Sequence, residues 1–217
     1  MTMKNEKSTT LLSKFSVSIS QIKLDQIFDR VLRIMFPNAE QGLRYPVFRT
    51  AAFLVPMVNI ELACIDSNGK VLLTRREASS DIPAEGWHLP GGIIRVGEKL
   101  TTRIKKTAMQ EMGFDIINEK IISFSETIVP NKISRRHFIS FLAVCEPQIK
   151  KGKLSTKSNQ GSWFGYDELP NDLIVNHERY RNLLEQLCKS KGRAYDSMMF
   201  IKQCEKFEAQ YYNKQCE

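Results

Sequence analysis

Apolar residues near the N-terminus recur at steps of three and four positions between residues 20 and 35, which is the spacing of an amphipathic helix. Residues 1–18 before them are polar and basic, and we expect them to be poorly ordered. Residues 38–56 show no period and contain Pro46 and Pro56, which predicts an irregular connection. The apolar face of the helix needs a covering surface, so we expect it to contact the main domain or a second copy in a homodimer.

The main domain begins with strand and turn signals. Residues 58–65 (VNIELACI) predict a strand, and the Asp-Ser-Asn-Gly stretch at 66–69 predicts a turn. Residues 70–75 then predict the second strand of a β-hairpin with the first. A polar loop at 77–85 follows and leads into residues 87–92 (WHLPGG).

The middle of the chain predicts one central helix followed by further strands. Residues 100–112 predict a helix that ends at Gly113. Apolar runs at 120–128 and 137–145 predict two strands, and residues 162–170 (SWFGYDELP) predict a short strand that leads into a turn.

Two late segments, 178–188 and 194–213, predict helices, and the second of them is highly charged. Strands interleaved with a central and a late helix favour an α/β fold in which helices cover a mixed sheet. The predicted organisation is an N-terminal extension at 1–50, a main domain at 51–190 and a C-terminal helical tail at 191–217.

The composition is that of an ordinary globular protein, with 42% hydrophobic and 26% charged residues among 217. No apolar run approaches the roughly 18 residues of a membrane-spanning helix, and the N-terminal residues lack the apolar core of a secretory signal. The net charge of +8 favours an anionic partner. Because the lysines and arginines are spread along the chain, a solvated basic surface is favoured over a nucleic-acid site, and nucleotide sugars are anions that suit it.

The five cysteines are odd in number and contain no Cys-x-x-Cys pair. They indicate neither a disulfide framework nor a zinc site. Cys64 and Cys145 lie inside apolar strand segments, where a free thiol packs as a small apolar group. This pattern predicts a reducing, cytoplasmic setting.

The most informative segment is residues 87–114 (WHLPGGIIRVGEKLTTRIKKTAMQEMGF). Five residues separate Gly92 from Glu98, and the helix that follows ends with Glu111 and Gly113. Adjacent glycines let the backbone approach an ion closely. A carboxylate near them suits a divalent cation that neutralises phosphate charge. The spacing is that of a motif for phosphate chemistry.

This segment resembles the Nudix box, whose pattern is G-x5-E-x7-R-E-U-x-E-E-x-G-U, with U an aliphatic residue. The match is partial, because Lys106, Thr107 and Gln110 stand where the box has an arginine and two glutamates. Of the acidic trio, Glu111 alone remains. One carboxylate suits a single Mg²⁺ that is held chiefly by substrate oxygens and water. The resemblance implies a Nudix α/β/α sandwich with a mixed sheet, extended here by N-terminal and C-terminal helices.

Residues 50–180 look especially similar to one Nudix branch, the GDP-mannose mannosyl hydrolases. Residues 56–61 (PMVNIE) look like that branch's Pro-Leu-Val-Ser-Leu-Asp, and Arg76 looks like its catalytic arginine. Residues 106–111 (KTAMQE) look like its altered box, which also keeps the last glutamate alone. Most Nudix enzymes cut between phosphorus atoms, whereas this branch displaces GDP from the anomeric carbon of the sugar with inversion.

The resemblance also implies a set of site residues. Mg²⁺ would be held by the Gly91 carbonyl, by Glu111 and by a side chain of the loop before Trp163, where Gln160 and Asn159 are the candidates. Arg76 would contact the diphosphate.

Four further residues are candidates for substrate or metal contact. Glu61 stands where the branch has an aspartate that holds the nucleotide or the sugar, and Arg95 and Arg136 are candidates for phosphate contact. Glu98 could be a second metal ligand, although its place at a helix start near Lys106 favours a structural role.

The general base of that branch, a loop histidine, has no counterpart in residues 157–162 (KSNQGS). Losing a general base typically lowers a rate by about 10²–10⁴, so another group or the phosphate itself would have to serve. His88 and His137 are candidates that the sequence favours as structural residues, and we expect His177 to lie on the surface at a helix start.

Three functions remain open. The first is Mg²⁺-dependent hydrolysis of a nucleoside diphosphate sugar of the GDP-mannose type, which releases GDP and the sugar. The second is a pyrophosphohydrolase that cuts the P–O–P bond of a nucleotide sugar or an ADP-ribose-like compound. The third is a Nudix domain that binds a nucleotide with little or no catalysis, which Thr107, Gln110 and the missing histidine favour.

Overall fold

The computed structural model describes residues 21, 23–34, 36, 41–76, 85–128, 137–148, 161–193 and 199–201. The chain divides into two compact units, Met1–Leu43 and Arg44–Glu217. In the first unit residues 23–34 are helical, as predicted, and the apolar side chains of Leu24, Ile27 and Phe28 are exposed. What covers this face, the main domain or a second copy, stays a prediction. Within the described ranges, no helix is long and apolar enough to cross a membrane.

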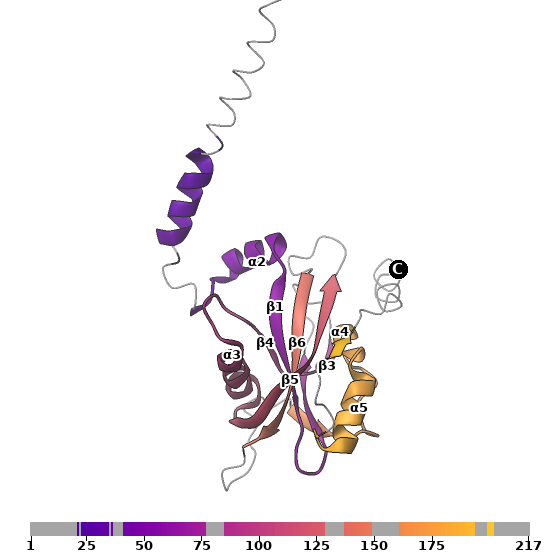
Figure 1. The fold of residues 1–217 in the computed structure, drawn as a ribbon. Helices are drawn as coiled ribbons and strands as arrows, with labels where there is room; N and C mark the ends of the chain where they lie inside the picture. The colour runs from indigo at the N-terminus through magenta and orange to yellow at the C-terminus, as the bar shows by residue number, and fades with distance from the viewer. Residues whose placement is uncertain are drawn as a thin grey trace, which may run out of the picture. The chain divides into compact units, whose positions relative to one another are not determined.

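The second unit contains two sheets (Figure 1). The larger has five strands in the order β4-β1-β6-β5-β8, and the smaller has three in the order β3-β2-β7. In the larger sheet β1 pairs in parallel with β6, and β5 pairs antiparallel with β6. The larger sheet is therefore mixed, as predicted. The strands are β1 (Met57–Cys64), β2 (Val71–Arg76), β3 (Gly86–His88), β4 (Gly91–Ile93), β5 (Ile116–Ile128), β6 (His137–Pro147), β7 (Gly161–Phe164) and β8 (Met199–Ile201).

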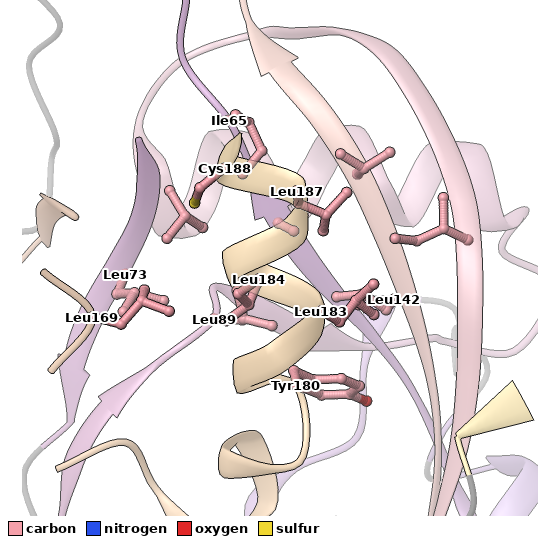
Figure 2. Close-up of a cluster of buried hydrophobic side chains, with 14 of the residues drawn as sticks. Ile65, Leu73, Leu89, Leu142, Leu169, Tyr180, Leu183, Leu184, Leu187 and Cys188 are labelled. Atoms are coloured by element: carbon pink, nitrogen blue, oxygen red, sulfur yellow. The ribbon is translucent and has the colours of Figure 1, made fainter. Parts of the chain in front are cut away.

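Helices lie against both faces of the larger sheet (Figure 1). Side chains of a strand alternate between the two faces. Ile60, Leu62 and Cys64 of β1 pack with α3 (Leu100–Thr107) and the π-helical turn η2 (Ala108–Met112). Ala63 of β1 packs with α5 (Arg181–Ser190) on the other face. Figure 2 shows how Leu183, Leu184 and Leu187 of α5 enter this second core. The remaining helices are α2 (Tyr45–Leu54) and α4 (Val175–Glu178).

The predicted hairpin of residues 58–65 and 70–75 is wrong in its pairing. The turn forms as predicted, with the Asp66 carboxylate accepting the N–H of Lys70 at 2.8 Å. A single bridge, Ile65 to Val71, joins the two segments, and β2 then enters the smaller sheet. The reason is that β1 is bonded on both edges, by β4 and β6, so it has no edge left for β2.

Two other predicted segments differ from the structure. Residues 45–54, predicted as irregular, form α2, because Pro46 lies at the start of the helix, where the missing N–H costs nothing. Residues 199–201, predicted as part of a charged helix, form β8, which pairs in parallel with β5 at its open edge. The rest of the predicted 194–213 helix lies outside the described residues.

Gly92 allows α3 to approach β4 closely. A Cβ atom on Gly92 would lie 2.7 Å from Thr107 Oγ1, much closer than van der Waals contact. Thr107 is 1% exposed, and its Oγ1 has no hydrogen-bond partner among the described residues. The first glycine of the box is therefore required by helix packing.

His88 in β3 is buried opposite Thr74 of β2. Its Nδ1 lies 2.8 Å from the Leu89 carbonyl oxygen, to which it donates. Burial and the nearby Arg76 charge lower the pKa of His88 to about 4, against the opposing effect of the Leu89 carbonyl. The imidazole is therefore neutral at pH 7.

We expect Gly92→Ala to lower the free energy of unfolding by about 1–3 kcal/mol, the usual cost of an extra methyl group in a packed contact. The double variant Gly92→Ala/Thr107→Ala lacks the clashing oxygen. There, relative to Thr107→Ala alone, the alanine at position 92 should cost less than about 0.5 kcal/mol. Urea unfolding of the four proteins measures this coupling. Additive losses would show that Thr107 Oγ1 does not limit residue 92.

We expect the chain to lose stability as the pH falls, because of the lowered pKa of His88. Its pKa is about 4 in the folded chain against an ordinary 6.5, so the unfolded chain alone binds the proton between these values. The contribution of His88 to the free energy of unfolding should have its full value above pH 6.5. It should fall by up to about 3 kcal/mol as the pH drops to 4.

Urea unfolding at pH 7 and pH 4.5 of the wild type and His88→Asn isolates this contribution from that of the carboxylates. The difference between the two pH values should be smaller in the variant. An equal difference in both proteins would contradict the lowered pKa.

Candidate active site

Three residues predicted for the site come together from three separate elements. Glu61 lies in β1, Arg76 ends β2, and Glu111 lies in η2. Burial lowers the pKa of Arg76, while the charges of Glu111 and Glu61 oppose that effect. Burial likewise raises the pKa of Glu111, and the Arg76 charge opposes it. One guanidinium is therefore within electrostatic reach of two carboxylates.

The sequence predicts a helix over residues 100–112, but the part that carries Glu111 is not a regular α-helix. After Thr107 it continues as a π turn, in which the Gly113 N–H donates to the Ala108 carbonyl at 3.0 Å. A π turn contains more residues than an α turn, so Glu111 takes a different position around the axis than a regular helix would give it. The turn ends at Gly113, as predicted, with φ of +81°, which favours glycine.

Gly91 starts β4 and lies directly opposite Glu61 in β1. A Cβ atom on Gly91 would lie 3.0 Å from the Ile60 carbonyl oxygen and 3.7 Å from Glu61 Cγ. The Pro90 carbonyl accepts the Leu62 N–H at 2.8 Å. The turn between β3 and β4 is thus fixed against β1 next to Glu61.

Glu61 is 6% exposed, although it carries a charge. Its Oε1 lies 3.4 Å from His177 Nε2, while its Oε2 has no hydrogen-bond partner in the described structure. Burial would raise the pKa of Glu61, but hydrogen bonds from His177 and Tyr180 and the charge of Arg179 outweigh it and lower the pKa below its usual range. Glu61 is therefore an ionised buried carboxylate whose Oε2 accepts no hydrogen bond from the residues that the structure describes.

His177 is buried, so its predicted surface position is wrong. Residues 172–174 run beside β3, where Trp87 N–H donates to the Asp172 carbonyl and Ile174 N–H to the Trp87 carbonyl, both at 2.9 Å. This pairing directs the start of α4 inwards and leaves His177 6% exposed. The sequence contains no local signal that joins His177 to Glu61, because 115 positions between them are bridged only by the fold.

Glu98 is occupied by the protein's own cations. Its Oε2 lies 2.6 Å from Arg103 Nη2, and its Oε1 lies 3.0 Å from Lys106 Nζ. It also accepts the Arg95 backbone N–H at 3.2 Å. These contacts favour the structural role over that of a second metal ligand.

The remaining predicted residues lie in other elements or outside the described residues. Arg95 is in the turn between β4 and α3, and His137 starts β6, where its Nε2 is 2.9 Å from Glu126 Oε1. Gln160 and Arg136 lie outside the described residues.

The donors present suit a hard cation held mainly by its substrate. In the described ranges, no group of three or more His, Cys, Asp or Glu side chains is arranged to hold a metal. Glu111 is a half-buried carboxylate, and burial raises its pKa. A nearby cation would therefore stabilise its ionised form. Mg²⁺ commonly uses one or two carboxylates together with substrate phosphates.

Comparison with known proteins shows the family. The family model of the NUDIX domain matches residues 56–187, more than half of the chain. A curated relative, the low-salt glycan biosynthesis protein Agl8 of Haloferax volcanii, is 33% identical over 91 residues, which are 40% of this chain and 56% of that protein. The chain thus spans little more than half the length of this relative.

Solved structures with similar folds have low sequence identity. A NUDIX hydrolase from Nitrosomonas europaea is 18% identical with a TM-score of 0.49, over 68% of this chain and 80% of that one. The MutT protein of Bacillus halodurans is 16% identical with a TM-score of 0.49, over 70% and 93%. An ADP-ribose pyrophosphatase of Streptococcus suis is 18% identical with a TM-score of 0.45, over 69% and 100%.

The match over residues 56–187 contains both sheets except for β8. It also contains the glycine turn and the helix that carries Glu111. The predicted fold class, a mixed sheet between helices, is confirmed with it. The chain belongs to the Nudix family.

Proposed function

We propose that this chain hydrolyses a nucleoside diphosphate sugar of the GDP-mannose type, with Mg²⁺, and releases GDP and the sugar. The observation that carries the proposal is the cluster of Glu61, Arg76 and Glu111, in which three elements bring Arg76 within electrostatic reach of both carboxylates. The similarity to a protein named for glycan biosynthesis supports a sugar-containing substrate.

Arg76 is the cation of this cluster, and it would bind the diphosphate. A guanidinium presents a planar fork of N–H donors that matches phosphate oxygens. Its partly buried position strengthens electrostatic interactions relative to open water. Arg76 would therefore stabilise the charge that builds on the departing diphosphate.

The metal would be held by Glu111, the Gly91 carbonyl and Gln160, together with substrate oxygens. When bound, Mg²⁺ neutralises diphosphate charge and so helps the leaving group depart. Glu111 contributes the carboxylate, and Arg76 limits how far burial raises its pKa.

Glu61 would select the hydroxyl-bearing part of the substrate. Its Oε2 is buried and has no hydrogen-bond partner in the part of the chain that the structure describes. A carboxylate oxygen accepts hydrogen bonds and cannot donate them when ionised. A hydroxyl group of a sugar or a ribose is the complementary donor, and a buried acceptor left unbonded costs about 1–3 kcal/mol.

The test is a screen of nucleotide sugars with Mg²⁺ in H₂¹⁸O, with products identified by mass. Cleavage at the anomeric carbon gives GDP and places ¹⁸O in the sugar. Cleavage between phosphorus atoms gives GMP and a sugar phosphate, with ¹⁸O in a phosphate, and would assign the pyrophosphohydrolase instead. Binding without any product would assign the ligand-binding function.

We expect Glu111→Gln to lower kcat/KM by about 100-fold or more, because the metal loses its charged protein ligand. Steady-state kinetics over a range of Mg²⁺ concentrations measures this effect. Glu119→Gln is the matched control, since Glu119 is a carboxylate that pairs with Lys105. Unchanged activity of Glu111→Gln would remove Glu111 from the site.

We expect Arg76→Lys to lower kcat by about 10-fold or more, because an ammonium cannot bind two phosphate oxygens in the bidentate geometry. Arg75→Lys is the matched control, since Arg75 is more exposed and pairs with Asp172 at 2.8 Å. Equal kcat values for the two variants would show that Arg76 does not act on the diphosphate.

A further inference from the structure

The ring of His177 connects the turn before β4 with Glu61. The Leu89 N–H donates to His177 Nδ1 at 2.8 Å, and Nε2 lies 3.4 Å from Glu61 Oε1. A backbone amide can only donate, so Nδ1 carries no proton. The proton of the neutral ring is then on Nε2, which faces the carboxylate.

The position of this ring is fixed by its surroundings. His88 and Tyr180 lie edge-on to it, each with a ring-centroid distance of 6.0 Å. The backbone of residues 172–174 is hydrogen-bonded to Trp87 in β3. The hydrogen bonds of its own segment therefore fix the position of His177, and its two ring nitrogens contact Leu89 and Glu61.

We infer that His177 is a positioning residue, which sets the Leu89–Gly91 turn and the Glu61 carboxylate relative to each other. The inference rests on the proposed function, since it assigns a reaction role to what the ring holds. Through Nδ1 it holds the turn that ends at Gly91, and through Nε2 it holds one oxygen of Glu61. The second oxygen, Oε2, is then presented in a defined direction.

Packing alone does not account for a histidine here. An apolar side chain could fill the space, but the Leu89 N–H would lose its acceptor and Glu61 would lose one of its donors. Unbonded buried groups of this kind are costly, most of all a charged one. His177 satisfies both groups with one rigid ring, which couples their positions.

The two halves of this role can be separated by two isosteric variants. His177→Asn keeps an oxygen near the place of Nδ1, so it can still accept the Leu89 N–H, but it does not reach Glu61. His177→Gln keeps an NH₂ group near the place of Nε2, so it can still donate to Glu61, but it lacks the acceptor for Leu89.

We expect opposite kinetic effects from these variants. His177→Asn should raise KM for the nucleotide sugar about tenfold or more with kcat nearly unchanged, because Glu61 loses its orientation. His177→Gln should lower kcat about tenfold or more with KM nearly unchanged, because the turn at Gly91 is released. A structural role alone would lower the unfolding temperature of both variants without this KM-against-kcat split.

Hydrogen exchange at the Leu89 amide gives a readout that does not depend on activity. The amide should exchange about tenfold faster or more in His177→Gln and nearly as in the wild type in His177→Asn. Asp172→Asn is the control, because it breaks the exposed ion pair with Arg75 on the same segment and should leave both readouts within about twofold. All measurements are made below the unfolding transition of each variant.

The outcomes separate this inference from the proposed function. Equal Leu89 exchange in both variants, or kcat and KM within twofold of the wild type in both, would overturn the role of His177. If the wild type turns over no nucleotide sugar, the proposed function fails, and the inferred reaction role fails with it. The Leu89 exchange pattern then decides whether His177 holds the turn at all.

Discussion

The pairing of β4 with β1 is the contact on which the rest of the site depends. It places Gly91 opposite Glu61, and the Pro90 carbonyl is bonded to the Leu62 N–H. The same short strand carries Gly92, whose missing side chain lets α3 approach. β1 in turn is bonded on both edges and packed on both faces. A shift of β4 along β1 would therefore move the glycine turn, Glu61 and α3 relative to one another.

The carboxylates of the site differ in how far neighbouring charges and hydrogen-bond donors compensate them. An ionised carboxylate in a buried position is costly unless charges or donors compensate it. Glu61 has His177, Arg179 and Tyr180 for this purpose, and Glu98 has Arg103 and Lys106. Among the described residues, Arg76 is the charge that compensates Glu111, and it does not prevent burial from raising the pKa of Glu111. This least compensated carboxylate is the one that a metal and a diphosphate would complete.

Sequence predicted the elements better than their partners. Gly113 ends its helix as predicted because a left-handed residue is a local requirement. The predicted hairpin is wrong because strand pairing depends on which edges of β1 are free. One of these edges pairs with β6, which is distant in the sequence. The π turn depends on packing rather than on composition, and no residue type announces it. His177 was missed for the same reason, since its partners Leu89 and Glu61 meet it only in the fold.

The departures from the Nudix box have physical counterparts in the structure. Lys106 replaces the arginine of the box and still pairs with Glu98 at 3.0 Å, so that ion pair survives. Thr107 replaces a glutamate at a point where the side chain is buried against Gly92. One acidic side chain is thereby lost from the helix that carries Glu111, while Glu61 supplies a buried carboxylate from β1. The site of this chain therefore depends on the C-terminal helices as well as on the box, because His177, Arg179 and Tyr180 keep that carboxylate ionised.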